Sequence, residues 1–167
     1  LISVYKPKLK WVNIDSLAPN ALMKQQFMSL NYDLVKAEYT YGDSRIDFYM
    51  EKNGEKFLTE VKGCTLADDL HPGIGLFPDA PTERGVKHLH ELTKAAKEGC
   101  HTAIAFVIQM NGIHRVLPNE AAQPEFKKAL VEAAKAGVQI VCYSCHVEAD
   151  RVKITSVTED TSSYVNM

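Results

Sequence analysis

The stretch YMEKNGEKFLTEVKGCT, residues 49–65, decides the fold because it places a turn signal between two runs of strand-forming residues. Asn53-Gly54 is a strong hairpin signal, since a two-residue type I′ turn needs positive φ at both positions. The loop fixes the register of the two strands and places Asp47 directly opposite Glu60. The sequence therefore predicts a hairpin with two facing carboxylates.

A second turn signal adds a third strand. Gly42-Asp43 suits the centre of a type II′ turn and places Glu38 opposite Asp47. One face of the three strands is therefore predicted to carry a row of carboxylates: Glu38, Asp47 and Glu60. The opposite face is expected to be core and carries Val35, Ala37, Tyr39, Ile46, Phe48, Met50, Phe57, Thr59 and Val61.

Three carboxylates in a row need a counter-charge, because like charges directly opposite each other destabilise a sheet. A hard divalent cation, Mg²⁺ or Mn²⁺, supplies one and takes oxygen ligands. Arg45 and Lys62 form the next row on this face, where they would meet a phosphate, and Lys62 would position the attacking water. The alternative is an ion-pair network in which Arg45 and Lys62 neutralise the acids, and a β-bulge would undo the row.

The bulk composition is that of one ordinary globular domain. The chain has 167 residues, of which 46% are hydrophobic and 24% charged, and its formal net charge is −2. Binding of a polyanion therefore needs a local basic patch or a metal. The longest apolar run, 103–108, is too short to span a bilayer, and four cysteines without a signal peptide favour reduced thiols in a cytoplasm. Because the chain opens on Leu1, we expect a processed or truncated product.

The remaining elements follow from hydrophobic periodicity and turn residues. Strands are expected over 1–14, 34–41, 45–51, 56–64, 102–110, 138–147 and 151–157, and helices after Asp15 or Ser16, over 82–98 and over 124–137. The stretch 65–81, rich in proline and glycine, is expected to be an irregular functional loop, and 158–167 a disordered tail. Strands that alternate with helices in the second half favour an α/β layered domain with a mixed sheet.

Three strings of residues carry a resemblance to a known family. They are RIDF (45–48), TEVKGCTL (59–66) and GLFPDAPTERGVKHLHEL (75–92). Over about 11–157 the chain resembles the sugar fermentation stimulation protein family of bacteria and archaea, and the spacing of its charged residues is similar to that of the PD-(D/E)xK nuclease superfamily. The resemblance implies a restriction-endonuclease-like three-layer core, a mixed β-sheet flanked by helices, with nucleic acid, and DNA in the first place, as the ligand.

The resemblance also implies roles for single residues. Asp47, Glu60 and the backbone carbonyl of Val61 would bind the metal, and Lys62 would be the catalytic base or charge stabiliser. The superfamily usually has a further acid on its first helix, but no carboxylate lies between residues 17 and 30. Glu38 is expected to replace it, from the strand register.

The chain differs from the expected patterns in two further ways. Ile46 stands where the superfamily name has proline. The resemblance to the family also implies an N-terminal OB-like domain before this region. Residues 1–10 are interpreted as its remnant or as an edge strand, and residues 11–157 as the nuclease-like domain. Part of the nucleic-acid contact would then lie outside this chain.

The helix expected over 82–98 supplies two further candidates. Arg84 and His88 lie one turn apart on its flank and are predicted to contact the substrate. The leading hypothesis is a metal-dependent phosphodiesterase that hydrolyses DNA or RNA. Two alternatives stay open: a non-catalytic DNA-binding regulatory protein that keeps the nuclease scaffold, and a scaffold in which the charged row is structural. No membrane partner is expected.

Overall fold

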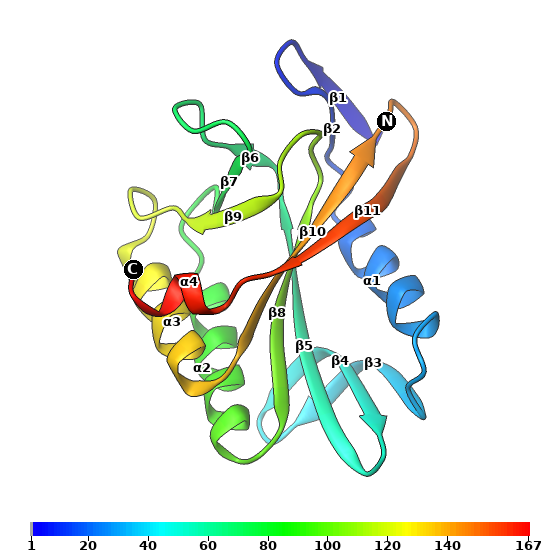
Figure 1. Cartoon of the computed structure of the whole chain (residues 1–167), viewed down its shortest axis with the longest axis vertical. Helices are drawn as coiled ribbons and strands as arrows, with labels where there is room; N and C mark the ends of the chain where they lie inside the picture. The colour runs from blue at the N-terminus through cyan, green and yellow to red at the C-terminus, as the bar shows by residue number, and fades with distance from the viewer. Residues whose placement is uncertain (1) are drawn as a thin grey trace.

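A computed structural model describes residues 2–167, and Leu1 lies outside the described residues. Over this part of the chain a six-stranded mixed sheet, here called the main sheet, runs through the centre (Figure 1). Its strands, in spatial order, are β11 (Val152–Glu159), β10 (Gln139–Val147), β8 (His101–Ile108), β5 (Glu55–Cys64), β4 (Ser44–Lys52) and β3 (Leu34–Tyr41). The central strands β5, β8 and β10 are parallel, and antiparallel strands complete both edges.

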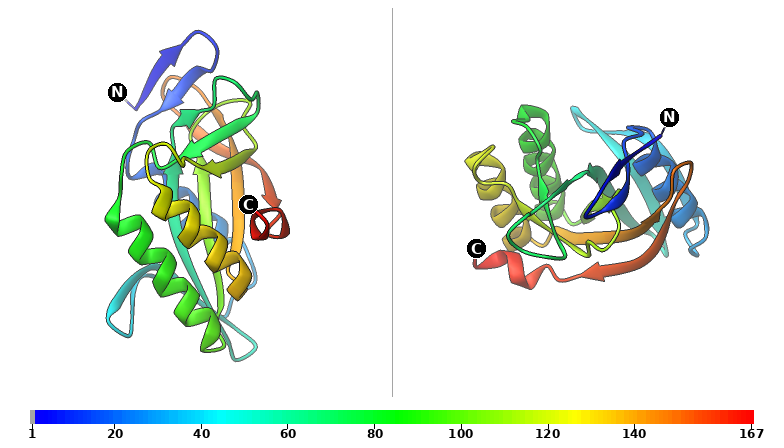
Figure 2. Two further views of the ribbon diagram at one scale, coloured as in Figure 1. Left: turned by 90° about the vertical axis from the view of Figure 1, so that its left-hand side faces the viewer. Right: turned by 90° about the horizontal axis from the view of Figure 1, so that it is seen from above.

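Helices cover both faces of the main sheet (Figures 1 and 2). The helices α2 (Glu83–Lys97) and α3 (Pro124–Ala136) pack on one face, and α1 (Ala18–Met28) packs on the other. The central strand β8 is buried on both sides, so that Ile104 and Phe106 contact the α2 and α3 layer while Ala105 and Val107 contact the α1 layer. The expected three-layer α/β fold is confirmed.

Both predicted hairpins form with the expected register. Asn53 and Gly54 have φ of 52° and 78°, and the β4–β5 ladder runs from the Lys52–Glu55 pair to the Phe48–Thr59 pair. At the β3–β4 turn Gly42 has φ of 57°, the positive value that a type II′ turn requires at its first central position.

The predicted assignment of side chains to faces is wrong at Ile46 and at Tyr39, its partner on β3. Ile46 and Phe48 lie two residues apart, yet Ile46 packs in the α2 and α3 layer and Phe48 in the α1 layer. Regular alternation would put both on one side, so β4 is irregular at Asp47, where its ladder with β5 has ended. Ile46 therefore shares no core face with Val61, and α2 covers the face that carries Glu60.

The stretch 65–81 is less irregular than predicted. It contains β6 (Leu66–Ala67) and β7 (Ile74–Phe77), which form a small sheet with β9 (Arg115–Pro118) in the order β6-β7-β9. These strands are two to four residues long, too short for a periodic pattern to reveal them.

Both ends of the chain differ from the predictions. The N-terminal region is a hairpin of β1 (Ser3–Lys6) and β2 (Lys10–Asn13), so the boundary expected after residue 10 falls inside an element. The tail expected to be disordered continues β11 to Glu159 and then forms α4 (Ser162–Val165). Tyr164 anchors this end because its side chain is buried and its hydroxyl donates to the Val116 carbonyl at 2.6 Å.

Between residues 2 and 167, no helix has the length and apolar character needed to cross a membrane.

Candidate functional site

Asp47 and Glu60 lie together where β4 and β5 separate. The backbone N–H of Asp47 donates to Glu60 Oε1 at 3.1 Å, and the N–H of Val61 donates to Asp47 Oδ2 at 2.8 Å. The two carboxylates thus take backbone donors that a continued ladder would have paired with carbonyls. This exchange explains the irregularity of β4 and holds both acids at one place.

Glu60 is the more buried acid, with 1% of its surface exposed. Its Oε2 atom lies 3.1 Å from His88 Nδ1 and 4.0 Å from Lys62 Nζ, but within residues 2–167 it has no hydrogen bond of good geometry. Burial raises the pKa of the Glu60 carboxyl above its usual value, and the Asp47 charge acts in the same direction. A carboxylate oxygen placed in this way is underpaired unless a proton or a cation joins it.

Lys62 follows two residues later and meets the same histidine. Its Nζ lies 2.9 Å from His88 Nδ1, and burial lowers the pKa of its ammonium group below the usual value. His88 reaches this position from the second turn of α2 and is buried there. Its Nδ1 bonds with Lys62 Nζ and lies 3.1 Å from Glu60 Oε2, so one ring nitrogen lies between the base and the acid.

Asn20, in the first turn of α1, was not identified from the sequence. Its Nδ2 donates to Asp47 Oδ1 at 3.2 Å, so both Asp47 oxygens are held from opposite sides. The first helix therefore does reach the site, as the resemblance implied, but with an amide in place of a carboxylate. The signal available in the sequence is an amide next to Pro19 at the helix start, which is not an acid.

Gly63, next to Lys62, allows three segments of the chain to pack closely beside the carboxylate pair. A Cβ atom at this position would collide with Gln109 Oε1 and Pro19 Cγ. Gln109 is buried and its Nε2 donates to Asn13 Oδ1 at 2.7 Å and to the Asp15 carbonyl at 3.0 Å. The glycine after Lys62 thus lets β5, the N-terminal hairpin and the start of α1 meet closely.

The expected third member of the carboxylate row does not join the pair. Glu38 has φ of 55° and forms an ion pair with Arg45 at 3.1 Å, with 70% and 69% of the two side chains exposed. The two residues neutralise each other on the surface, and neither lies with Asp47 and Glu60. Over residues 2–167, no group of three or more histidine, cysteine or acidic side chains is arranged to hold a metal.

Arg84 lies in the first turn of α2 and is exposed. Its positive charge adds to the lowering of the Lys62 pKa that burial causes. The structure therefore brings together Asp47, Glu60, Lys62 and His88, adds Asn20, and leaves Glu38, Arg45 and Arg84 exposed.

The donors that remain fit a small hard cation. Asp47 and Glu60 supply oxygen ligands from two adjacent strands, and Glu60 Oε2 is buried without a good hydrogen bond among the described residues. Two carboxylates are enough for Mg²⁺, which keeps several waters and commonly completes its octahedron with a substrate phosphate.

A mixed sheet between two helical layers, with paired acids and a lysine at its centre, defines an α/β protein with a polar central site. Residues 14–151 match the family described as "Sugar fermentation stimulation protein RE domain". The chain belongs to the sugar fermentation stimulation protein family, which confirms the resemblance found in the sequence.

Relatives with the description "Sugar fermentation stimulation protein homolog" support this assignment. The one from Desulfitobacterium hafniense (strain Y51) is 42% identical over 158 residues, which cover 92% of this chain and 67% of the relative. The one from Clostridium botulinum (strain Hall / ATCC 3502 / NCTC 13319 / Type A) is 40% identical over 163 residues, which cover 93% of this chain and 69% of the relative.

A solved structure has the same fold. "The structure of Pyrococcus Furiosus SfsA in complex with Ca2+" superposes with a TM-score of 0.77 at 23% sequence identity, and the match covers 95% of this chain and 68% of that one.

Proposed function

We propose that this protein is a divalent-metal-dependent phosphodiesterase that hydrolyses nucleic acid, with DNA as the favoured substrate. The observation that carries the proposal is the buried Glu60 carboxylate beside Asp47, with Lys62 on the same face of the same strand. Acid, acid and lysine in this spacing are the pattern of the PD-(D/E)xK superfamily, and the matching family description contains the words "RE domain".

Asp47 and Glu60 would hold the metal, together with the backbone carbonyl of Val61. Mg²⁺ or Mn²⁺ is the ion proposed, because oxygen ligands suit both. A structural relative was solved with Ca²⁺, another hard cation that takes oxygen ligands. When bound, the ion would polarise a phosphoryl oxygen and lower the pKa of water.

The side chains around the metal ligands have separate tasks. Lys62 would hydrogen-bond the attacking water or the phosphoryl oxygen, and burial, which lowers the pKa of its ammonium group, favours its use as a base. His88 holds Lys62 Nζ in place through Nδ1. Arg84, exposed at the start of α2, would contact the phosphate next to the reacting one.

A cleavage assay tests this function. Single- and double-stranded DNA and RNA are incubated with the protein in Mg²⁺, in Mn²⁺ and in chelator, in parallel with Asp47→Asn and Lys62→Met. Arg45→Ala, which breaks only the surface pair with Glu38, is the matched control. Cleavage that needs metal, is lost in the first two variants and persists in the control supports the proposal. Absence of cleavage on all four substrates in both metals contradicts it.

The non-catalytic regulatory protein is the second candidate, and one observation favours it. Both Asp47 oxygens already accept hydrogen bonds, from Asn20 and from the Val61 N–H, so this acid is satisfied without a metal. Nucleic-acid binding that persists in chelator, with no cleavage in any metal, would identify this alternative.

A further inference from the structure

The N-terminal hairpin, β1 and β2 with the turn between them, projects from one end of the molecule (Figures 1 and 2). Its turn carries Lys6, Lys8 and Lys10, all exposed. Residues 2–14 contain no acidic side chain, and across the described part of the chain none of these three lysines forms an ion pair. In a chain of net charge −2 this is a concentrated positive patch.

An aromatic pair follows the lysines in the ladder, on the opposite face of the hairpin from Lys6 and Lys10. Tyr5 and Trp11 are cross-strand partners, and their rings meet edge to face with centroids 5.4 Å apart. Tyr5 is 60% exposed, so one ring face is free to stack on a planar group. The narrow hairpin thus carries charge on one face and a stacking platform on the other, and a single strand that crosses its tip meets both.

Lys10 has φ of 62°, in the left-handed region that glycine and asparagine adopt most easily. Folding alone would be better served by one of those two residues at this turn position. Strained backbone is found where surrounding structure and function retain it. The lysine is therefore better explained by the charge that it adds than by the turn that it makes.

The hairpin is fixed to the site rather than loosely attached. Asn13, its last residue, accepts from Gln109, which packs against Gly63 next to Lys62. Asn111 Nδ2 donates to the carbonyls of Leu9 and Trp11 at 3.3 Å each. A ligand that spans the site and the hairpin would therefore meet two surfaces held at a constant distance.

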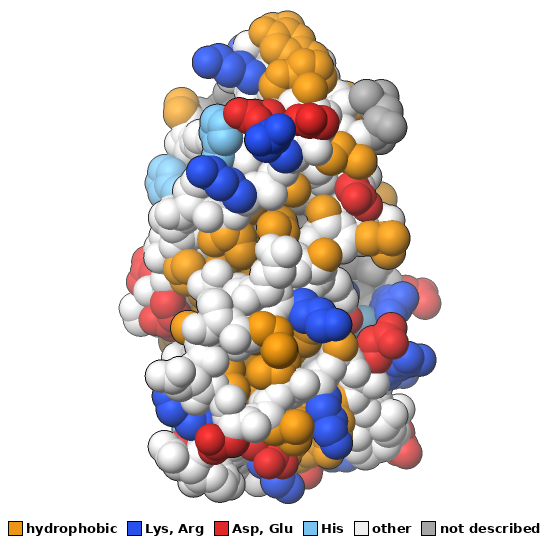
Figure 3. Space-filling view, turned by 90° about the vertical axis from the view of Figure 1, so that its right-hand side faces the viewer, with side chains coloured by type: hydrophobic (Ala, Val, Ile, Leu, Met, Phe, Trp, Pro, Cys, Tyr) orange, Lys and Arg blue, Asp and Glu red, His pale blue; other side chains and the backbone are white. Residues whose placement is uncertain are grey.

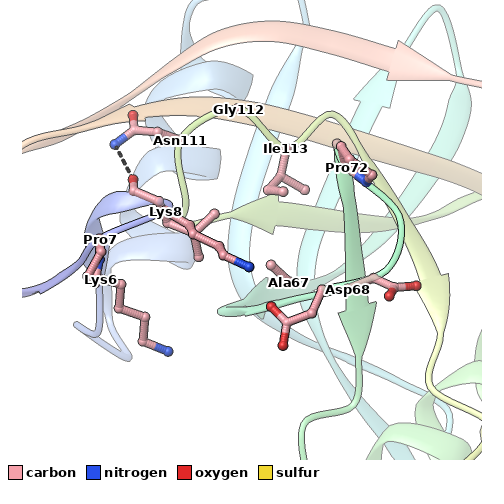
Figure 4. A pocket seen from close by; sticks show the side chains of 12 residues that line it. Lys6, Pro7, Lys8, Ala67, Asp68, Pro72, Asn111, Gly112 and Ile113 are labelled. Atoms are coloured by element: carbon pink, nitrogen blue, oxygen red, sulfur yellow. Dashed lines mark hydrogen bonds between the residues drawn. The ribbon is translucent and has the colours of Figure 1, made fainter.

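The charges near the hairpin set the side from which an anion approaches. A cavity of about 610 Å³ separates its turn from the loop 67–73, with Lys6 and Lys8 on one wall and Asp68 and Asp69 on the other (Figure 4). On the acidic wall, His71 Nδ1 lies 2.8 Å from Asp68 Oδ2. The acidic wall repels a phosphate from the interior of the cavity, so an anion meets these lysines at the open end, by the tip of the turn.

Charged side chains also surround the tip of the hairpin on the outer surface of the molecule. In Figure 3 basic side chains lie beside a large apolar group at the upper tip of the molecule, where the hairpin projects, and acidic side chains lie below them. In the nearby β10–β11 turn, Glu148 and Asp150 pair with Arg151 at 3.2 and 3.5 Å. Arg151 offsets one of these two negative charges, and the hairpin adds three lysines that form no ion pair among residues 2–167.

We propose that the N-terminal hairpin is a second contact surface for nucleic acid, with Lys6, Lys8 and Lys10 on the phosphates and Tyr5 stacked on an unpaired base. The inference rests on the proposed function and names its substrate form: a single-stranded segment that extends from the carboxylate pair past the start of α1 to the hairpin. An unpaired base is required because a duplex hides the ring faces that Tyr5 would contact.

Binding of a fluorescent single-stranded oligonucleotide, followed by anisotropy in chelator, tests the hairpin without any need for cleavage. The variants are Lys6→Gln, Lys8→Gln, Lys10→Asn and Tyr5→Ala, with Lys128→Gln on the far layer as the matched control, since Lys128 is exposed on α3. Each lysine variant should lower the slope of log affinity against log salt by roughly 0.7. Tyr5→Ala should weaken binding about 10-fold, and Tyr5→Phe should restore it.

Lys10→Asn separates binding from folding. Asparagine tolerates a left-handed backbone, so this variant should melt no lower than the parent protein while it binds more weakly. Hairpin variants that bind and cleave as the parent does would overturn the inference and leave the proposed function standing. Lysine variants that lose binding to vesicles of anionic lipid, but not to the oligonucleotide, would overturn it in favour of a membrane contact.

Discussion

Asn20 Nδ2 lies 3.2 Å from Asp47 Oδ1, and this single hydrogen bond joins the first turn of α1 to the carboxylate pair of the main sheet. The other Asp47 oxygen accepts from the Val61 N–H at 2.8 Å. The acid is thus oriented from two directions. In the proposed metal site, the lone pairs that these donors leave free would determine where the cation lies.

Asn20→Ala should weaken the binding of Mn²⁺ by about 10-fold or more, because partners that orient a metal ligand contribute on that scale. Calorimetric titration with Mn²⁺ measures the change. Gln25→Ala removes an exposed amide from the same helix and is the matched control. Equal affinities of Asn20→Ala and the parent protein would show that Asp47 needs no orientation from α1.

Glu60→Gln should change how stability depends on pH. The folded state holds the Glu60 proton more tightly than the unfolded state, because burial raises its pKa above the ordinary value of 4.5. The free energy of unfolding therefore falls as pH rises from that value through the raised pKa, and the variant lacks this fall. Urea unfolding at a series of pH values should show that the free energy of unfolding of the variant, relative to that of the parent, increases with pH.

Saturating Mg²⁺ should reduce the difference in unfolding free energy between Glu60→Gln and the parent at high pH, since the cation would bind the ionised carboxylate of the parent. Glu38→Gln is the control, because this carboxylate is exposed and paired only with Arg45. Curves for Glu60→Gln and the parent that stay parallel across the pH series would contradict the buried, underpaired acid.

The sequence predicted the strand registers because local rules determine them. Asn53 and Gly54 adopt positive φ in the β4–β5 turn, and that turn alone sets which residues face each other. The face assignment failed beyond Phe48, where the carboxylates of Asp47 and Glu60 replace the ladder. A pattern that assumes regular pleating cannot anticipate a side chain that takes a backbone donor.

Contacts made by packing were equally beyond a local rule. Asn20 is 27 residues from Asp47 in sequence, and the two meet because α1 packs across the sheet. His88 was predicted near the site from its helix flank, but its contact with both Glu60 and Lys62 depends on the buried position of α2. Tyr164 lies in a polar segment whose composition resembles that of a frayed tail, and one buried ring orders it.

Tyr164→Phe should lower the free energy of unfolding by about 1 to 2 kcal/mol, because the Val116 carbonyl loses its buried donor while the ring stays in place. Urea denaturation measures this effect. Tyr5→Phe is the matched control, because Tyr5 is exposed on the hairpin and the same change there should have little effect. Equal losses in both variants would mean that the α4 anchor contributes nothing specific.

Gly63→Ala should cost about 1 to 3 kcal/mol of stability, because the added methyl group collides with Gln109 Oε1 and Pro19 Cγ in a closely packed region. The same change displaces β5 beside Lys62, so metal affinity should fall as well. Combined with Gln109→Ala, which removes the first obstacle, Gly63→Ala should cost less than it does alone, and a double-mutant cycle by urea unfolding measures that coupling. Strict additivity of the two changes would contradict the close contact and, with it, the connection between the carboxylate site and the N-terminal hairpin that Gln109 provides through Asn13.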